Sequence, residues 1–211
     1  MLRGKEVSRV EGFSDAVFGF TLTLLVVSVD VPASFADLRN ILVGFPAFAV
    51  TFAVICWVWY EHHLFFRRYD LEDGFTVFVN CVLLFIVVFY AYPLKFVFTR
   101  LITGTLLGYG PTIMDGMTQA DSRLLMLVYS SGFVLLFGTF VALHWNAWRQ
   151  RERLALDTME LFDARAGITF FLLGPAHGMF GYINGRRRDR LEASLCPPSG
   201  TLQPETTSAS A

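Results

Sequence analysis

Long apolar runs separated by short polar turns dominate the chain. Four of these runs cover residues 13–31, 40–60, 75–98 and 124–145. A helix needs about 20 mostly apolar residues to cross the roughly 30 Å hydrocarbon core of a bilayer, and each run meets this requirement. The pattern therefore predicts four firm transmembrane helices joined by short turns.

A fifth apolar run, at residues 166–183, is shorter and is interrupted by Gly174 and Pro175. A proline inside a helix removes a backbone hydrogen bond, so the helix bends or ends there. The last residues are rich in proline, serine and threonine, a composition typical of disorder. We expect an all-α integral membrane protein, a bundle of transmembrane helices with four firm spans and one or two weak C-terminal ones. Residues 1–190 form the single transmembrane domain, and residues 191–211 form a disordered, cytoplasmic-type tail.

The composition agrees with a membrane protein. Hydrophobic residues make up 54% of the 211 residues, with 22 phenylalanines, and the mean hydropathy is +0.50. A soluble domain could not bury so much apolar surface in one core. The three cysteines form no CxxC pair, so neither a disulfide framework nor a zinc site is expected. No basic stripe alternates with aromatic residues, which excludes a nucleic-acid partner.

The basic residues predict an orientation. They gather before the first run and after the second and fourth: Arg3, Lys5, Arg9, Arg67, Arg68, Arg149, Arg151 and Arg153. The turn at residues 31–38 has none, so the positive-inside rule puts the N-terminus in the cytoplasm. A full crossing by residues 166–183 would put the arginines at 186–188 outside. Either that run is re-entrant or the rule fails there.

The first run carries a specific motif. Arg9, Phe13, Ser14 and Asp15 form the pattern R-x-x-x-F-S-D, and Pro32 ends the segment. This stretch resembles the first helix of the transmembrane protein 175 family of potassium channels, the prokaryotic relatives of the endolysosomal channel.

Weaker likenesses follow in the next two runs. Trp59, His62 and His63 resemble the end of the family's second helix, and Asn80 belongs to a pattern similar to its third helix. The resemblance covers roughly the first two-thirds of the chain. One departure lies beyond residue 148, where the chain offers one weak span and the family has two.

The resemblance implies a function. Bacterial members are six-span subunits that assemble as tetramers, with the first helix lining the pore. It therefore implies a homotetrameric ion channel of the cell membrane that is selective for potassium ions or prefers them. No enzyme activity, cofactor or metal site is expected, and the partners are potassium ions and membrane lipid.

Residues three and four apart share a helix face, so the first run presents one continuous stripe of side chains. Its members are Ala16, Phe20, Thr23, Val27 and Asp30. In four copies around an axis, apolar rings can gate by dewetting, hydroxyls can replace hydration water, and carboxylates can concentrate cations.

By resemblance, Phe20 takes the place of the family's hydrophobic constriction, where an aliphatic residue is usual, and Thr23 that of its pore-lining threonine. Ordinary helix packing is the alternative, in which Thr23 bonds to a carbonyl one turn back.

The motif also suggests a polar network at the inner end of the bundle. Arg9 and Asp15 are six residues apart, about 9 Å along a helix. We expect both to join Trp59 and either His62 or His63, which would hold the first helix against the second. The alternative is that each polar side chain separately reaches the membrane interface.

Three rival interpretations remain. The stretch Gly108-Tyr109-Gly110 resembles the filter of other potassium channels, but its context favours a glycine and proline turn on the outer side. A proton-coupled secondary transporter would use Asp15 or Asp30 to carry protons. The four histidines suggest a metal or haem site, but His62 and His63 point about 100° apart on a helix and cannot share one face.

Overall fold

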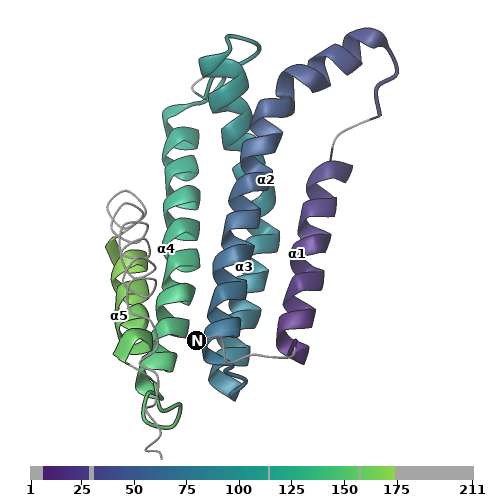
Figure 1. The fold of residues 1–211 in the computed structure, drawn as a ribbon. Helices are drawn as coiled ribbons and strands as arrows, with labels where there is room; N and C mark the ends of the chain where they lie inside the picture. The colour runs from purple at the N-terminus through teal and green to yellow at the C-terminus, as the bar shows by residue number, and fades with distance from the viewer. Residues whose placement is uncertain (1–6, 29–30, 114, 157, 174–211) are drawn as a thin grey trace, which may run out of the picture.

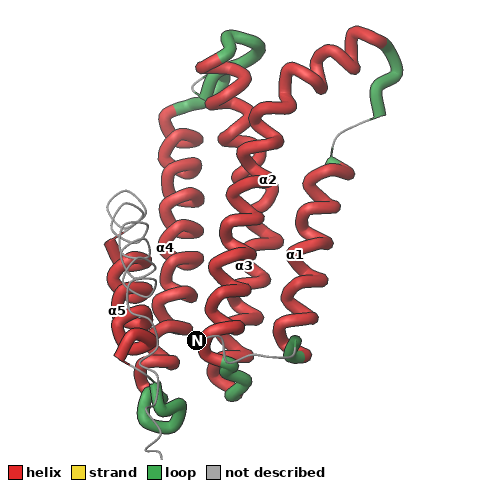
Figure 2. The backbone as a smooth tube through the Cα atoms, viewed as in Figure 1, coloured by secondary structure: helices red, strands yellow, loops and turns green. Residues whose placement is uncertain are grey.

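The computed structural model describes residues 7–28, 31–113, 115–156 and 158–173. Their elements are α1 (Arg9–Val27), α2 (Phe35–Tyr69), α3 (Gly74–Phe98), the π-helix η1 (Thr99–Leu106), α4 (Gln119–Arg149) and α5 (Thr158–Leu173). The described residues contain helices and loops and no strand (Figure 2). The predicted all-α fold is therefore confirmed. The predicted tail, 191–211, lies outside the described residues.

Four helical segments are long and apolar enough to cross a membrane: α1, α2, α3 with η1, and α4. Each contains most of one predicted run, so the chain is a multi-pass membrane protein. The helices α2 and α4 continue past both ends of the predicted runs, and α2 alone has 35 residues, whereas α1 begins before its run but ends at Val27, short of residue 31. The fifth run was predicted to begin at residue 166, but α5 begins at Thr158. Gly174 and Pro175 lie outside the described residues.

The helices run alternately up and down the bundle (Figure 1). α1 and α3 run in the same direction, while α2 and α4 run in the opposite one. We call the end where α1 begins the N-terminal end, and the opposite one the far end. The basic residues predicted to share one side gather at the N-terminal end: Arg9, Arg67, Arg68, Arg149, Arg151 and Arg153.

The turn between α2 and α3 is short because polar side chains end one helix and begin the next. Asp70 ends α2 in the left-handed conformation, with φ of 51°. Asp73 caps α3 by accepting hydrogen bonds from the Thr76 backbone and hydroxyl. At the far end, Thr118 and Asp121 form a reciprocal capping box at the start of α4.

The helix α2 bends away from the bundle at its beginning (Figure 1). Pro46 lies inside the helix, where its ring prevents a regular backbone hydrogen bond. Residues 35–45, which we call the α2 arm, therefore extend over the far end. The arm and η1 form the far-end surface described below.

The helix α3 lies at the centre and packs against α1, α2 and α4. In its contact with α4, one α3 side chain forms hydrogen bonds to backbone groups of α4. The Tyr90 hydroxyl donates to the Val128 carbonyl and accepts from the Gly132 amide, at 2.9 Å for the second bond. A Cβ at position 132 would overlap the Tyr90 ring, which explains the glycine.

The helix α5 packs against α4. The Phe171 ring stacks on the Phe140 ring with centroids 4.7 Å apart, and the His144 ring lies directly over Gly167. An ion pair between Arg68 and Asp163, 2.9 Å long, ties α5 to the end of α2. The fifth helix is thus part of the bundle through residue 173.

A second polar contact joins α3 and α4 at the N-terminal end. The Asp73 carboxylate accepts hydrogen bonds from Asn146, at 3.0 Å, and from Gln150, at 3.1 Å. Burial raises the pKa of Asp73, whereas these bonds and those from Thr76 lower it. The hydrogen bonds together outweigh burial, so the pKa lies below the usual carboxyl value. The ionised carboxylate therefore stabilises the fold.

Replacing Asp73 by asparagine should lower the thermal stability in detergent at neutral pH, by about 1 kcal/mol. Because the pKa of Asp73 is lowered in the folded state, its stabilisation is complete above the usual carboxyl pKa and is lost as pH falls through the folded value. The difference from wild type should therefore shrink as the pH falls below the usual carboxyl range. Asp70→Asn, at the exposed left-handed position, is the control. A difference that does not change with pH would contradict this assignment.

Candidate functional site

The helix α1 has two distinct faces. One face packs into the bundle through its buried residues: Glu11, Ser14, Phe18, Thr21 and Leu25. The predicted stripe, at Ala16, Phe20, Thr23 and Val27, lies on the other face and is exposed in the single chain. Phe20 is 58% and Val27 70% exposed, although both are large and apolar. Asp30 lies outside the described residues.

The Thr23 hydroxyl donates a hydrogen bond to the Gly19 carbonyl, at 2.9 Å. This is the bond that ordinary helix packing predicts. It occupies the hydrogen of the hydroxyl and leaves the oxygen lone pairs free to accept. Thr21, by contrast, forms the same type of bond on the buried face. Thr23 thus presents an oxygen acceptor on the exposed stripe.

A buried amide joins three helices behind this stripe. Asn80 of α3 donates from Nδ2 to the Ser14 hydroxyl of α1, at 2.9 Å. Its Oδ1 lies 2.8 Å from His62 Nε2 of α2, which must donate because the amide oxygen can only accept. The Ser14 hydroxyl in turn donates to the Val10 carbonyl. We call these three side chains, Ser14, His62 and Asn80, the polar knot.

A second set of contacts joins α1 to α2. The Trp59 indole donates to Asp15 Oδ1 at 2.7 Å, and its ring stacks on His63. One turn farther toward the N-terminal end, Glu11 Oε1 lies 3.2 Å from His63 Nδ1 and 3.4 Å from Arg67 Nε. The side chains of two antiparallel helices thus meet in order along their contact. We call these side chains the ladder: Glu11, Asp15, Trp59, His63 and Arg67. The Glu11 carboxylate is nearly fully buried in it.

The structure divides the predicted inner-end network. Asp15, Trp59 and His63 meet in the ladder, whereas His62 belongs to the polar knot. Arg9 is exposed and makes no contact with Asp15 among the described residues. Six helical residues turn the chain by about 600°, which leaves the two side chains about 120° apart. Phe13, the aromatic residue of the motif, is also exposed.

Two contact residues escaped the sequence analysis. Glu11 occupies the place expected for Arg9, and its signal is the four-residue spacing from Asp15. Lys95 is the single charged residue within the run at 75–98. Its amine donates to Ser28 at the end of α1, both to the hydroxyl and to the carbonyl, at 3.3 Å to the carbonyl. A charge inside a membrane helix needs such a partner.

Lys95 and the polar knot attach α1 to α3 at both ends. Ser14 and Asn80 are 66 residues apart, and Ser28 and Lys95 are 67 apart, so the register between the parallel helices changes by only one residue. The lysine charge also lies near the carboxyl end of α1, where the helix dipole favours a cation. The buried face of α1 is therefore fixed along its whole length.

The stretch Gly108-Tyr109-Gly110 forms a loop between η1 and α4. The two glycines have φ angles of 68° and 88°, the left-handed region that glycine enters without strain. The Tyr109 side chain is exposed. These angles fit a glycine turn at the far end of the bundle.

Replacing Asn80 by alanine should destabilise the folded chain by about 2–4 kcal/mol, because it creates a cavity and leaves the His62 donor without an acceptor. Unfolding in detergent, followed by heat or denaturant, measures the change. Cys81→Ala alters the adjacent exposed residue and is the matched control. Equal stability of the two variants would show that the knot does not hold the helices together.

Known proteins with related sequences include several channels. Residues 9–90 match the family model described as the endosomal/lysosomal potassium channel TMEM175. A potassium channel of Marivirga tractuosa is 37% identical over 176 residues, which cover 81% of this chain and 71% of that protein. A potassium channel of Chamaesiphon minutus is 31% identical over 178 residues, covering 81% of this chain and 79% of that protein.

A solved structure also matches the fold. It is a crystal structure of a variant of the potassium channel MtTMEM175 in complex with a nanobody-MBP fusion protein. The TM-score is 0.76 and the sequence identity 34%, and the match covers 87% of this chain and 81% of that one.

Proposed function

The chain belongs to the family of the endosomal/lysosomal potassium channel TMEM175, and we propose that it is a potassium channel subunit whose helix α1 lines the pore. The observation that carries the proposal is the pair of faces on α1. One face is fixed to α2 and α3 by buried polar contacts, and the other presents Phe20, Thr23 and Val27 uncovered. Such a helix can support a conduction pathway without moving as a whole.

A single chain cannot enclose a pore with one helix face, so the proposal requires several copies around an axis. Four copies, as in the family, would stack rings of Ala16, Phe20, Thr23 and Val27, and Asp30 is proposed as a further ring from the sequence alone. The hydroxyl ring at Thr23 would supply oxygen atoms to a cation that has lost part of its hydration shell. The acceptor lone pairs left by the bond to Gly19 support this role.

Phe20 is the proposed constriction. Its ring is large and exposed, and apolar rings close narrow pores by excluding water. Gly19 and Ala16, its neighbours on the exposed face, are small residues that leave room for the ring to rotate. A phenylalanine ring in this position would form a narrow gate.

The polar knot and the ladder are proposed to orient the pore face. A rotation of α1 about its axis would break the bond from Asn80 to Ser14 and the bond from Trp59 to Asp15 together. Since these bonds attach α1 to α3 and to α2, they would keep Phe20 and Thr23 directed away from the bundle. Their proposed role is therefore to position the pore helix.

The proposed location is the cell membrane, with the N-terminus in the cytoplasm. The arginines gathered at the N-terminal end support this orientation, because short cytoplasmic loops carry an excess of basic residues. The far end carries the longer connection between α3 and α4 and would face outward.

The alternative is a proton-coupled transporter, and an ion-flux experiment separates the two functions. Purified protein in liposomes should pass potassium ions down a potassium gradient without moving protons in a fixed ratio. Sodium gradients measured in the same vesicles test the potassium preference. Obligatory movement of protons with each potassium ion would refute the channel.

A substitution tests the proposed constriction. Phe20→Ala removes the ring and should raise potassium flux into liposomes severalfold, because a wider apolar section stays hydrated more of the time. Phe85→Ala removes a ring from α3 that is 72% exposed, more than Phe20, and should leave the flux unchanged. Identical flux in Phe20→Ala and wild type would place the gate elsewhere.

A further inference from the structure

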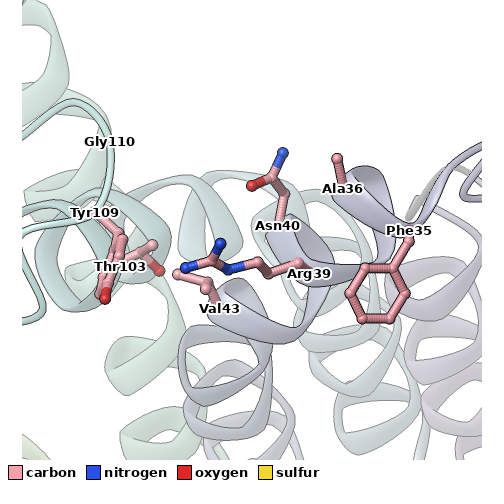
Figure 3. A pocket seen from close by; sticks show the side chains of 8 residues that line it. All are labelled: Phe35, Ala36, Arg39, Asn40, Val43, Thr103, Tyr109 and Gly110. Carbon is pink, nitrogen blue, oxygen red and sulfur yellow. The ribbon is translucent and has the colours of Figure 1, made fainter.

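The far end contains a cavity between the α2 arm and the segment that follows α3. Its volume is about 580 Å³, and Figure 3 shows the side chains that line it. They come from three short stretches of chain: Phe35, Ala36, Arg39, Asn40, Val43, Thr103, Tyr109 and Gly110. The cavity belongs to neither the pore face of α1 nor the contacts that fix it.

The cavity offers hydrogen-bond donors that have no acceptor. The Arg39 guanidinium extends from the α2 arm toward Thr103 and Tyr109 (Figure 3). Arg39 is exposed and has no carboxylate partner among the described residues. Its guanidinium and the nearby exposed Asn40 amide together fit an anion with several oxygen atoms.

Two other cations at the far end are already occupied. Arg100 donates to the Thr112 carbonyl at 3.2 Å and lies over the Phe96 ring. Lys95 donates to Ser28 at the end of α1. Arg39 is the one basic residue among the described residues that line the cavity.

The depth of the cavity in the membrane indicates the source of the anion. From Arg67, at the N-terminal end, about 20 residues of α2 cover the roughly 30 Å hydrocarbon core, which ends near Ala47. The α2 arm therefore lies at the level of the opposite headgroups. Leu38, Leu42 and Phe45 on the arm are exposed apolar side chains that suit contact with acyl chains.

We propose that this cavity binds the phosphodiester headgroup of a membrane phospholipid from the leaflet at the far end. Arg39 forms a paired, charge-assisted hydrogen bond to two phosphate oxygens, and the Asn40 amide donates to a third. Phe35 and Val43 contact the apolar part of the same lipid. A free phosphate ion would use the donors but not these apolar side chains, so the site is assigned to a lipid.

The test is lipid retention by the full chain. Protein purified in detergent with added phosphatidylglycerol is analysed by native mass spectrometry, and Arg39→Gln should bind the lipid at least about tenfold more weakly than wild type. Arg39→Lys should lose part of the affinity, because lysine cannot bind two oxygens in parallel. Arg123→Gln removes another exposed far-end cation, outside the cavity, and should bind as wild type does.

A second measurement guards against a folding defect. Phosphatidylglycerol should raise the melting temperature of wild type and of Arg123→Gln, since a ligand of the native state stabilises it, but not that of Arg39→Gln. Lipid-free melting temperatures should agree among the three proteins. Retention and thermal shift in Arg39→Gln equal to those of wild type would overturn the proposal. Displacement of the lipid by millimolar inorganic phosphate would overturn the assignment to a lipid.

Discussion

The buried amide of Asn80 sets the position of helix α1, the proposed pore helix. In an apolar bundle, a polar side chain without hydrogen-bond partners costs several kcal/mol, so its partners must be held close and in the right orientation. Asn80 satisfies its donor on α1 through Ser14 and its acceptor on α2 through His62. The two hydrogen bonds of one amide therefore require α1, α2 and α3 to keep their relative positions. A rotation of α1 about its axis would break the bond to Ser14.

The remaining polar contacts of α1 hold it against α2 and α3 at other positions along its axis. The ladder with α2 follows an antiparallel register, from Asp15 and Trp59 to Glu11 and Arg67. The contacts with α3 follow a parallel register and end at Lys95 on Ser28. Two registers in opposite directions fix both the rotation and the height of the helix. The proposed gate at Phe20 can then depend on its own side chain.

The two ends of the bundle differ in whether the charged side chains described here have partners within the protein. At the N-terminal end, carboxylates meet basic or amide partners within the protein, as Glu11 meets Arg67 and Asp73 meets Asn146. At the far end, Arg39 of the α2 arm lines a cavity together with residues that follow α3. We propose that this surface lies at headgroup depth. That surface supports the proposed lipid contact.

The sequence by itself determined the four spans, the gathering of arginines at one end and the exposed stripe on α1, because hydropathy and the 3.6-residue period are properties of a single helix. Hydropathy could not give the ends of α2 or the start of α5, since a helix continues where the apolar run stops. The tertiary structure alone decided that Glu11, not Arg9, enters the ladder, that His62 and His63 serve different neighbours, and that Lys95 holds Ser28. These pairings depend on the rotation and register of one helix against another, which the packing of the whole bundle selects.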